Sequence, residues 1–103
     1  MPIEVFYEGR IYRTNAKGTY DPDTGELTVI KGSIVSETVK QFQKTSLINK
    51  LREQYTDENG VLLQSITFDN PSLAASFVSG YSSNGLLTWH IDKHRTLRDM
   101  KKS

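Results

Sequence analysis

The sequence predicts an α+β protein in which a small, mostly antiparallel sheet carries two helices packed on one face. The chain has 103 residues, a length that suits a single domain over residues 1–103. Hydrophobic residues make up 36% and charged residues 24%, proportions typical of a folded globular chain. Apolar residues alternate in several short segments and follow a helical stripe in two others, which predicts short strands and two helices.

Residues 1–17 are expected to form an N-terminal β-hairpin. The segment IEVFY at 3–7 predicts a strand, and Glu8-Gly9 offers a turn. Residues 10–14 are expected to return beside this strand. The segment NAKG at 15–18 then breaks the strand pattern.

Two further strands are predicted in the middle of the chain. The segment DPDTG at 21–25 concentrates turn residues, because Pro presets φ, Asp bonds nearby backbone and Gly accepts positive φ. Residues 26–31 follow as a half-buried strand with Leu27 and Val29 on one face. Residues 61–68 are expected to supply another strand.

One apolar stripe predicts the first helix. We expect this helix to run from about Ser46, as its N-cap, to Tyr55, and to end before the stop signals at 57–60. The stripe consists of Leu47, Ile48, Leu51 and Tyr55.

The clearest helix begins after Asn70. Asn70 is a good cap, and Pro71 suits the first helical position because it has no amide to leave unpaired. The apolar residues that follow share one face, and Gly80 closes the helix. That face consists of Leu73, Ala74, Phe77 and Val78.

A tight turn at residues 82–85 and a final strand are expected next. Leu87, Trp89 and Ile91 alternate, which predicts the buried face of a strand and places Trp89 in the core rather than against a ligand. A short amphipathic helix is expected to follow. Its inward residues are Leu97 and Met100.

The residue types point away from catalysis and from a metal or other cofactor. The chain has no cysteine, which excludes disulfides, thiolate metal sites and a cysteine nucleophile. His90 and His94 have no third ligand at a recognisable spacing, and the serines suit caps and turns. The sequence has no recognisable signal peptide or membrane span, so we expect a cytoplasmic protein without a membrane partner.

Two segments have the chemistry to contact an anion. Lys31-Gly32-Ser33 offers a lysine, a bare backbone and a hydroxyl, although the glycine also suits the end of a strand. At Asn70-Pro71-Ser72 the first free amides of a helix and its dipole favour negative charge, and an ordinary capped helix fits the same residues. Both interpretations stay open for each segment.

The C-terminal tail is basic, although the whole chain has a formal net charge of only +1. Residues 93–103 contain one acidic residue, Asp99, among several basic ones. Such a tail suits a solvated helix end, and it also suits a surface that binds phosphates. The basic residues are Lys93, Arg95, Arg98, Lys101 and Lys102.

Several segments together resemble one known family. They are VIKGS at 29–33, FDNPSLAA at 68–75, Gly80, and NG at 84–85 followed by Trp89. Their order resembles the pattern V-x-x-G-S, F-x-S-P-S-x-A-A, G and N-G-W-x-x-W of the domain of unknown function 4357 family, and it is similar to the RAMA domain. The resemblance covers residues 18–100. Asn70 replaces the usual Ser, and Leu86 replaces the first Trp of N-G-W, which removes a stacking surface.

The resemblance implies a non-enzymatic accessory module that helps a restriction, modification or defence system to bind DNA, including modified DNA. Members of the family are often found behind GIY-YIG nuclease domains, so a nuclease or a methylase is an expected partner. In this interpretation the two arginines of the site bind phosphates. The expected nucleic-acid or anion contacts are Lys31, Gly32, Ser33, Asn70, Ser72, Ser83, Asn84, Arg95 and Arg98.

Two other functions fit the same sequence. A small anionic ligand such as a nucleotide is expected to bind where the helix at Pro71 starts beside Gly32-Ser33. A protein partner is expected to pair with an exposed edge of the hairpin at 3–14.

Overall fold

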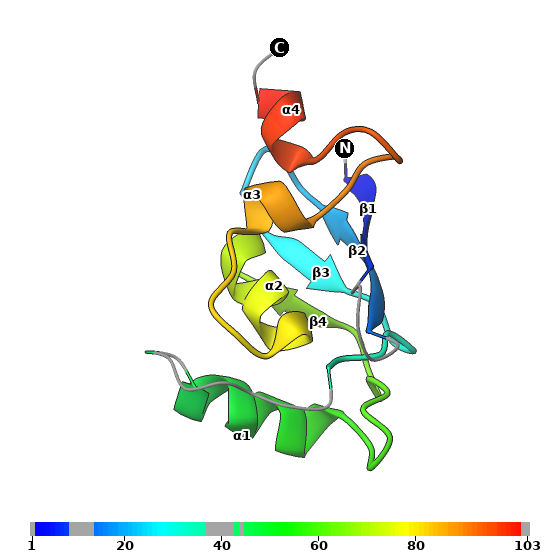
Figure 1. Ribbon diagram of the computed structural model, residues 1–103, viewed down its shortest axis with the longest axis vertical. Coiled ribbons are helices and arrows are strands. Elements are labelled where there is room, and N and C mark those ends of the chain that lie inside the picture. The colour runs from blue at the N-terminus through cyan, green and yellow to red at the C-terminus, as the bar shows by residue number, and fades with distance from the viewer. Residues whose placement is uncertain (1, 9–13, 37–42, 44, 102–103) are drawn as a thin grey trace.

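The computed structural model describes residues 2–8, 14–36, 43 and 45–101. Its sheet has four antiparallel strands: β1 (Ile3–Glu8), β2 (Asn15–Tyr20), β3 (Leu27–Val29) and β4 (Ile66–Phe68). Their order is β1-β2-β3-β4, so each strand pairs with its neighbour in the chain (Figure 1).

The described residues form four helices: α1 (Thr45–Tyr55), α2 (Pro71–Ser79), α3 (Gly85–Thr88) and α4 (Leu97–Lys101). α2 lies against β3 and β4, and α1 packs on α2 at one end of the molecule (Figure 1). α3 contacts both α2 and α4, and α4 lies at the opposite end. Sheet and helices together confirm the predicted α+β class.

β2 lies where the sequence predicted a break at 15–18. β1 and β2 pair over the full six residues of each strand. The prediction was wrong because Ala16 and Gly18 are too small to mark a buried face, yet both are buried. Gly18 has to be small, because a Cβ there would lie 2.5 Å from the carbonyl oxygen of Thr28. The expected return strand at 10–14 falls, but for its last residue, outside the described residues.

β3 confirms the strand predicted at 26–31, with Leu27 and Val29 fully buried. The strand predicted at 61–68 is shorter, because β4 is limited to the last three residues of that segment. Two earlier residues of the segment form only isolated bridges.

α2 has its predicted boundaries. The side-chain oxygen of Asn70 accepts the N–H of Leu73 at 2.8 Å, and Pro71 is the first helical residue. Gly80 ends the helix with a φ of 82°, a left-handed conformation that glycine adopts without strain. Local signals in the sequence were sufficient here.

α1 follows the predicted stripe with one exception. Three residues of the stripe pack in or against the core, whereas Leu47 is exposed. The helix begins at Thr45, so the prediction that Ser46 is its cap was wrong.

The final strand predicted from the alternation at 87–91 was wrong. α3 occupies the start of that segment, which leaves Leu87 exposed, while Trp89 is fully buried as expected. The alternation was misleading because Asn84 caps a helical turn here and accepts the N–H of Leu86 at 3.1 Å.

The core lies between the sheet and α2 and continues to α3 and α4. The ring centroids of Phe68 and Phe77 are 5.3 Å apart, and Tyr7 meets Trp89 edge-on at 5.9 Å. α4 is the expected terminal helix, and its Leu97 is fully buried. Within the described ranges, the helices are all too short or too polar to cross a membrane.

Candidate functional site

The starts of α2 and α3 meet in a polar junction. The hydroxyl of Ser72 accepts the N–H of Gly85 at 3.0 Å, and the indole N–H of Trp89 donates to the carbonyl of Pro71 at 3.0 Å. The backbones come so close that a Cβ on Gly85 would lie 2.1 Å from the carbonyl carbon of Pro71. The helix-start junction, as we call it, comprises Asn70, Pro71, Ser72, Asn84, Gly85 and Trp89.

The polar side chains predicted to contact DNA at this junction lie together, but they already have internal partners. Asn70 and Asn84 accept backbone N–H groups as helix caps. The hydroxyl of Ser83 bonds that of Ser79 at 2.9 Å, and the N–H of Ser83 donates to the hydroxyl of Ser76 at 3.3 Å. These bonds hold the two helix starts and the loop between them in place.

A hollow of about 430 Å³ opens beside the junction. Apart from Leu73, the described residues that line it carry hydroxyl or amide side chains, and they include no Lys or Arg. An anion here would meet the N-terminus of α2 without a cationic side chain beside it. The lining residues are Gln43, Asn70, Ser72, Leu73, Ser76, Ser82 and Ser83.

The segment Lys31-Gly32-Ser33 lies away from this hollow. Val29, the last residue of β3, pairs with Ile66, the first residue of β4. Because the strands are antiparallel, residues 31–33 follow one end of the pair and α2 begins at the other. The expectation that Gly32-Ser33 adjoins the start of α2 is therefore wrong.

The three residues of that segment also differ in what they offer. Ser33 is buried, and its hydroxyl accepts the N–H of Lys17 at 3.1 Å and donates to the carbonyl of Lys17 at 3.3 Å. Lys31 and Gly32 are exposed. Ser33 therefore anchors the segment to the backbone of β2, and Lys31 is the side chain of the segment that faces water.

Arg52 of α1 is a buried residue that the sequence did not reveal. Its guanidinium donates to the carbonyls of Phe77 at 3.0 Å and Val78 at 3.1 Å, in the last turn of α2, and to the carbonyl of Ser36 at 2.7 Å. Burial lowers the pKa of Arg52 to about 10, so the side chain stays charged at neutral pH. It satisfies the free carbonyls at the negative end of α2. Its position beside Leu51, in the stripe of α1, was the available signal.

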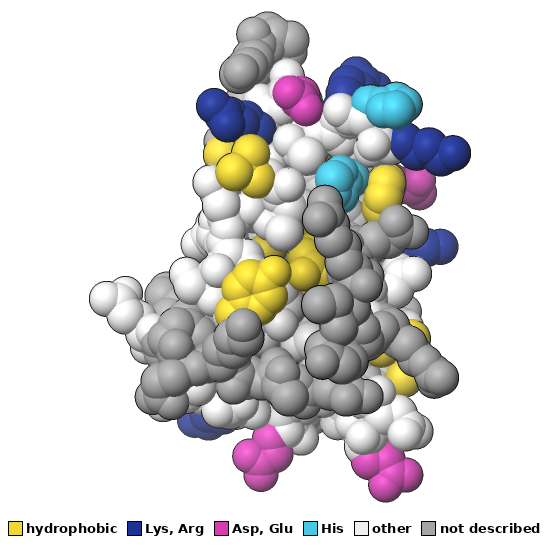
Figure 2. All heavy atoms as spheres, viewed as in Figure 1, with side chains coloured by type: hydrophobic (Ala, Val, Ile, Leu, Met, Phe, Trp, Pro, Cys, Tyr) yellow, Lys and Arg dark blue, Asp and Glu magenta, His cyan; other side chains and the backbone are white. Residues whose placement is uncertain are grey.

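Basic side chains gather at the end of the molecule formed by α4 and the segment before it (Figure 2). Those whose side chains the structure describes are exposed to solvent. Acidic groups lie at the opposite end of the same view and also among these basic side chains. We refer to Lys93, His94, Arg95 and Arg98 as the basic end.

Two carboxylates order the basic end. Asp92 accepts the N–H of His94 and of Arg95, each at 2.9 Å, and pairs with the Nε of Arg95 at 2.7 Å. The pKa of Asp92 is lowered, first by the backbone N–H of His94 and then by the side chain of Arg95. Asp99 caps α4 by accepting the N–H of Thr96 at 2.9 Å. Among the described residues, Arg98 forms no ion pair.

Comparison with models of known protein families identifies the family of this chain. A model described as Domain of unknown function (DUF4357) matches residues 6–101. The chain belongs to the DUF4357 family. The DUF4357 match begins before the expected start at residue 18 and takes in β2 and part of β1. A search of curated proteins and a search of solved structures each found no match.

The residues behind the DUF4357 resemblance are largely those of the helix-start junction. Pro71, Ser72, Gly85 and Trp89 bond to one another or pack in contact there. Leu86, which replaces a Trp of the pattern, is partly buried and packs against the core. In this DUF4357 chain the pattern therefore describes how two helix starts are joined.

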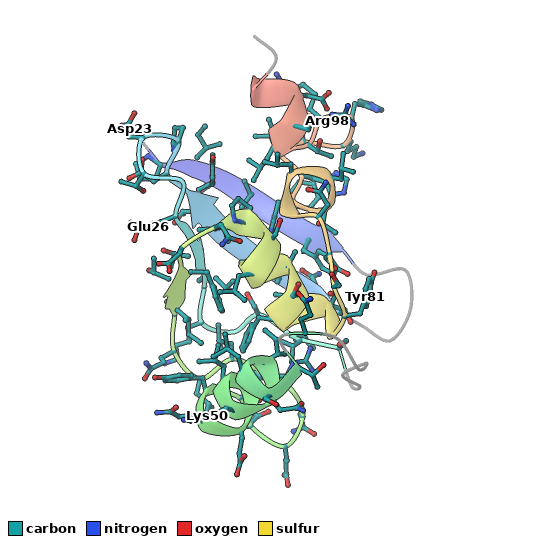
Figure 3. All side chains as sticks on the ribbon, turned by 90° about the vertical axis from the view of Figure 1, so that its left-hand side faces the viewer. Asp23, Glu26, Lys50, Tyr81 and Arg98 are labelled. Carbon is teal, nitrogen blue, oxygen red and sulfur yellow. The ribbon has the colours of Figure 1, made fainter. Side chains whose placement is uncertain are left out.

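Arg98 and the acidic residues of one loop lie on different sides of this DUF4357 chain. Figure 3 places Arg98 and Tyr81 on one side of the molecule and Asp23 and Glu26 on the other. The two acidic residues belong to the exposed connection between β2 and β3. A polyanion would be attracted to the side of Arg98 and repelled by the side of Asp23.

The two histidines form no metal site within the described residues. His90 exchanges backbone hydrogen bonds with Phe6 at 3.0 and 2.9 Å, and their rings stack at 5.5 Å. His94 is exposed. In the part of the chain that the structure describes, no three His, Asp or Glu side chains converge as a metal site would require.

Proposed function

We propose that this chain is a non-catalytic accessory module of a DNA restriction, modification or defence system, and that it binds DNA through the basic end. The observation that carries the proposal is the set of exposed cations on α4 and the segment before it. Phosphate contacts of this kind supply most of the affinity of a protein for DNA and position it on the duplex.

The arrangement of the two arginines supports this role. Asp92 engages Arg95 through Nε, which leaves the terminal nitrogens of that guanidinium for another acceptor. Arg98 projects from α4 without an ion pair in the described residues. A guanidinium binds phosphate with two parallel hydrogen bonds, so both residues suit contact with a DNA backbone.

A binding role also agrees with the use of the polar side chains. Serines and asparagines of the helix-start junction and its loop are committed to caps and loop bonds. Catalysis by a serine would require a hydroxyl bonded to a base, and these hydroxyls bond backbone groups or each other.

The rival functions have less support. The hollow beside the junction offers an anionic ligand no Lys or Arg among its described residues. A protein partner would find β1 partly covered, because Phe6 already exchanges two backbone bonds with His90. The other edge of the sheet, β4, is only three residues long.

The test is a titration of labelled double-stranded DNA, unmethylated and adenine-methylated, at low and moderate salt. We expect binding that weakens with salt. The double substitution Lys93→Gln with Arg98→Gln should lower the slope of log K against log salt by about 2, since each neutralised phosphate contributes about 0.9. A methylation preference would make the module a sensor of modified DNA.

Lys31→Gln with Lys50→Gln is the matched control, because both lysines are exposed, lie outside the basic end and change the net charge equally. This control also tests the expectation from the sequence that Lys31 contacts DNA. We expect this control to change the salt slope by less than about 0.5. If the salt slope falls equally in the two double variants, binding depends on net charge alone and not on the basic end. Absence of salt-sensitive binding to DNA, whether duplex or single-stranded, would refute the proposed function itself.

A further inference from the structure

Tyr81 is a large aromatic residue that the fold exposes and holds at several points. The residue is 44% exposed, whereas Phe77 and Trp89 are fully buried. Its N–H donates to the hydroxyl of Ser79 at 3.3 Å. Its carbonyl lies 3.1 and 3.2 Å from the hydroxyls of Ser79 and Ser83, which also contact each other, so one of the two hydroxyls donates to the carbonyl while the other donates to its neighbour. The backbone of Tyr81 is therefore fixed although the residue lies in a loop.

The far end of the Tyr81 side chain is also anchored. It hydrogen-bonds the side chain of Tyr7, which is buried in β1 and packs edge-on against Trp89. Burial, followed by the influence of Tyr81, raises the pKa of Tyr7 to about 12, so the Tyr7 phenol stays protonated at neutral pH. The exposed ring is thus tied through Tyr7 to the core.

Burial does not explain this arrangement, because a half-exposed ring leaves apolar surface in water. Gly80, with its φ of 82°, turns the chain outward just before Tyr81. A ring already held in one orientation loses little side-chain entropy when a flat partner stacks on it. The aromatic face is therefore preorganised for a planar ligand.

The position of Tyr81 indicates which planar ligand this is. Arg98 and Tyr81 lie on the same side of the molecule, opposite Asp23 and Glu26 (Figure 3). A chain whose phosphates bind the basic end can therefore bring a base toward Tyr81 along one face. Aromatic stacking beside a cationic surface is how proteins bind single-stranded nucleic acid.

We propose that Tyr81 is a stacking platform for an unpaired base, and that the nucleic acid preferred by this module is single-stranded. In a duplex both faces of a base are covered by its neighbours, so only an unpaired base can use the ring. This inference rests on the proposed function, since it assumes that the basic end binds the phosphates of the same molecule.

The experiment compares binding of a labelled single-stranded oligonucleotide and of the matched duplex. Tyr81→Ala should weaken binding to the single strand about 5- to 100-fold and change duplex binding by no more than about twofold. Tyr81→Phe is the control for folding, because it loses the hydroxyl bonded to Tyr7 and keeps the ring. It should bind the single strand within about threefold of the wild type.

A second measurement reads the ring directly. In Tyr81→Trp the new indole is exposed while Trp89 is buried. We expect the single strand to quench its fluorescence and the duplex to leave it nearly unchanged. Absence of quenching with bound single strand would overturn the platform.

The outcomes separate the two proposals. Salt-sensitive binding that depends on Arg98, with duplex preferred and Tyr81→Ala without effect, would overturn the stacking platform and leave the proposed function standing. Binding of neither ligand would overturn both. Single-strand preference lost in Tyr81→Ala and kept in Tyr81→Phe is the result that establishes the platform.

Discussion

The helix-start junction and the basic end put polar residues to opposite uses. At the junction, hydroxyls and amides bond backbone groups of the neighbouring helix or cap their own helix. At the basic end, four side chains project into water, and Asp92 ties down only one of them. The residues that carry the family resemblance therefore build the fold, whereas the residues free to meet a partner lie where the sequence shows no motif.

This difference has a physical cause. Two helix starts bring unpaired N–H groups together, and burying such groups without partners is costly, so the residues there are restricted to those with suitable acceptors. A surface that binds phosphates needs only positive charge in roughly the right place. The junction is consequently specific in sequence and the basic end is not.

The largest effect is expected from a substitution that disrupts the helix-start junction. Gly85→Ala should improve α3 by about 1 kcal/mol from helix propensity alone. The added Cβ would however lie 2.1 Å from the Pro71 carbonyl carbon. We expect the steric clash to outweigh the gain in helix propensity, so that the free energy of unfolding measured in urea falls by at least about 3 kcal/mol.

Gly25→Ala is the control for this substitution. Gly25 has a φ of 82° and no atom within 4 Å of an added Cβ, so only backbone strain opposes the change. We expect a loss of about 1 kcal/mol. If Gly85→Ala costs no more than Gly25→Ala, the close contact of the two helix starts is not as described.

The next effect concerns the other end of α2. Arg52→Met removes a guanidinium bonded to carbonyls of Phe77, Val78 and Ser36, and should cost about 3 kcal/mol of unfolding free energy. Lys50→Met, an exposed position on the same helix, should stay within about 0.5 kcal/mol of the wild type. Similar denaturation midpoints for the two variants would contradict a structural role for Arg52.

The smallest effect tests the link between core and surface through Tyr7. Its pKa is raised to about 12 in the folded protein, above the ordinary value of 10.0. The stabilisation is thus complete below pH 10 and is lost as the pH rises toward 12. The free energy of unfolding of Tyr7→Phe should therefore fall by about 2 kcal/mol less than that of the wild type over this interval, measured by urea unfolding at each pH. Parallel losses would show that Tyr7 titrates normally.

The sequence predicted the elements whose signals are local. Asn70, Pro71 and Gly80 mark the ends of α2 through their own backbone chemistry, and the structure has the same boundaries. β2 was missed because the burial of Gly18 depends on the close approach of Thr28, which is a tertiary contact. α3 was missed because the spacing of Leu87 and later apolar residues also fits a strand.

The candidate site was predicted in part for the same reason. Side-chain types made Asn70, Ser72 and Asn84 candidate nucleic-acid contacts, and the structure brings these three residues together. That they bond inward depends on how two helices meet, which no short segment encodes. Arg52 was missed because arginine is rarely buried, and its acceptors come from α2 and from Ser36.

The most direct test of the account measures DNA affinity in Ser72→Ala and Arg98→Ala, with the near-ultraviolet signal of buried Trp89 confirming that each is folded. We predict that Arg98→Ala binds about five- to tenfold more weakly at ~0.1 M salt with unchanged stability. Ser72→Ala should lose about 1 kcal/mol of stability and keep wild-type affinity. Loss of DNA binding in folded Ser72→Ala, with Arg98→Ala unaffected, would contradict the account and make the helix-start junction the binding site.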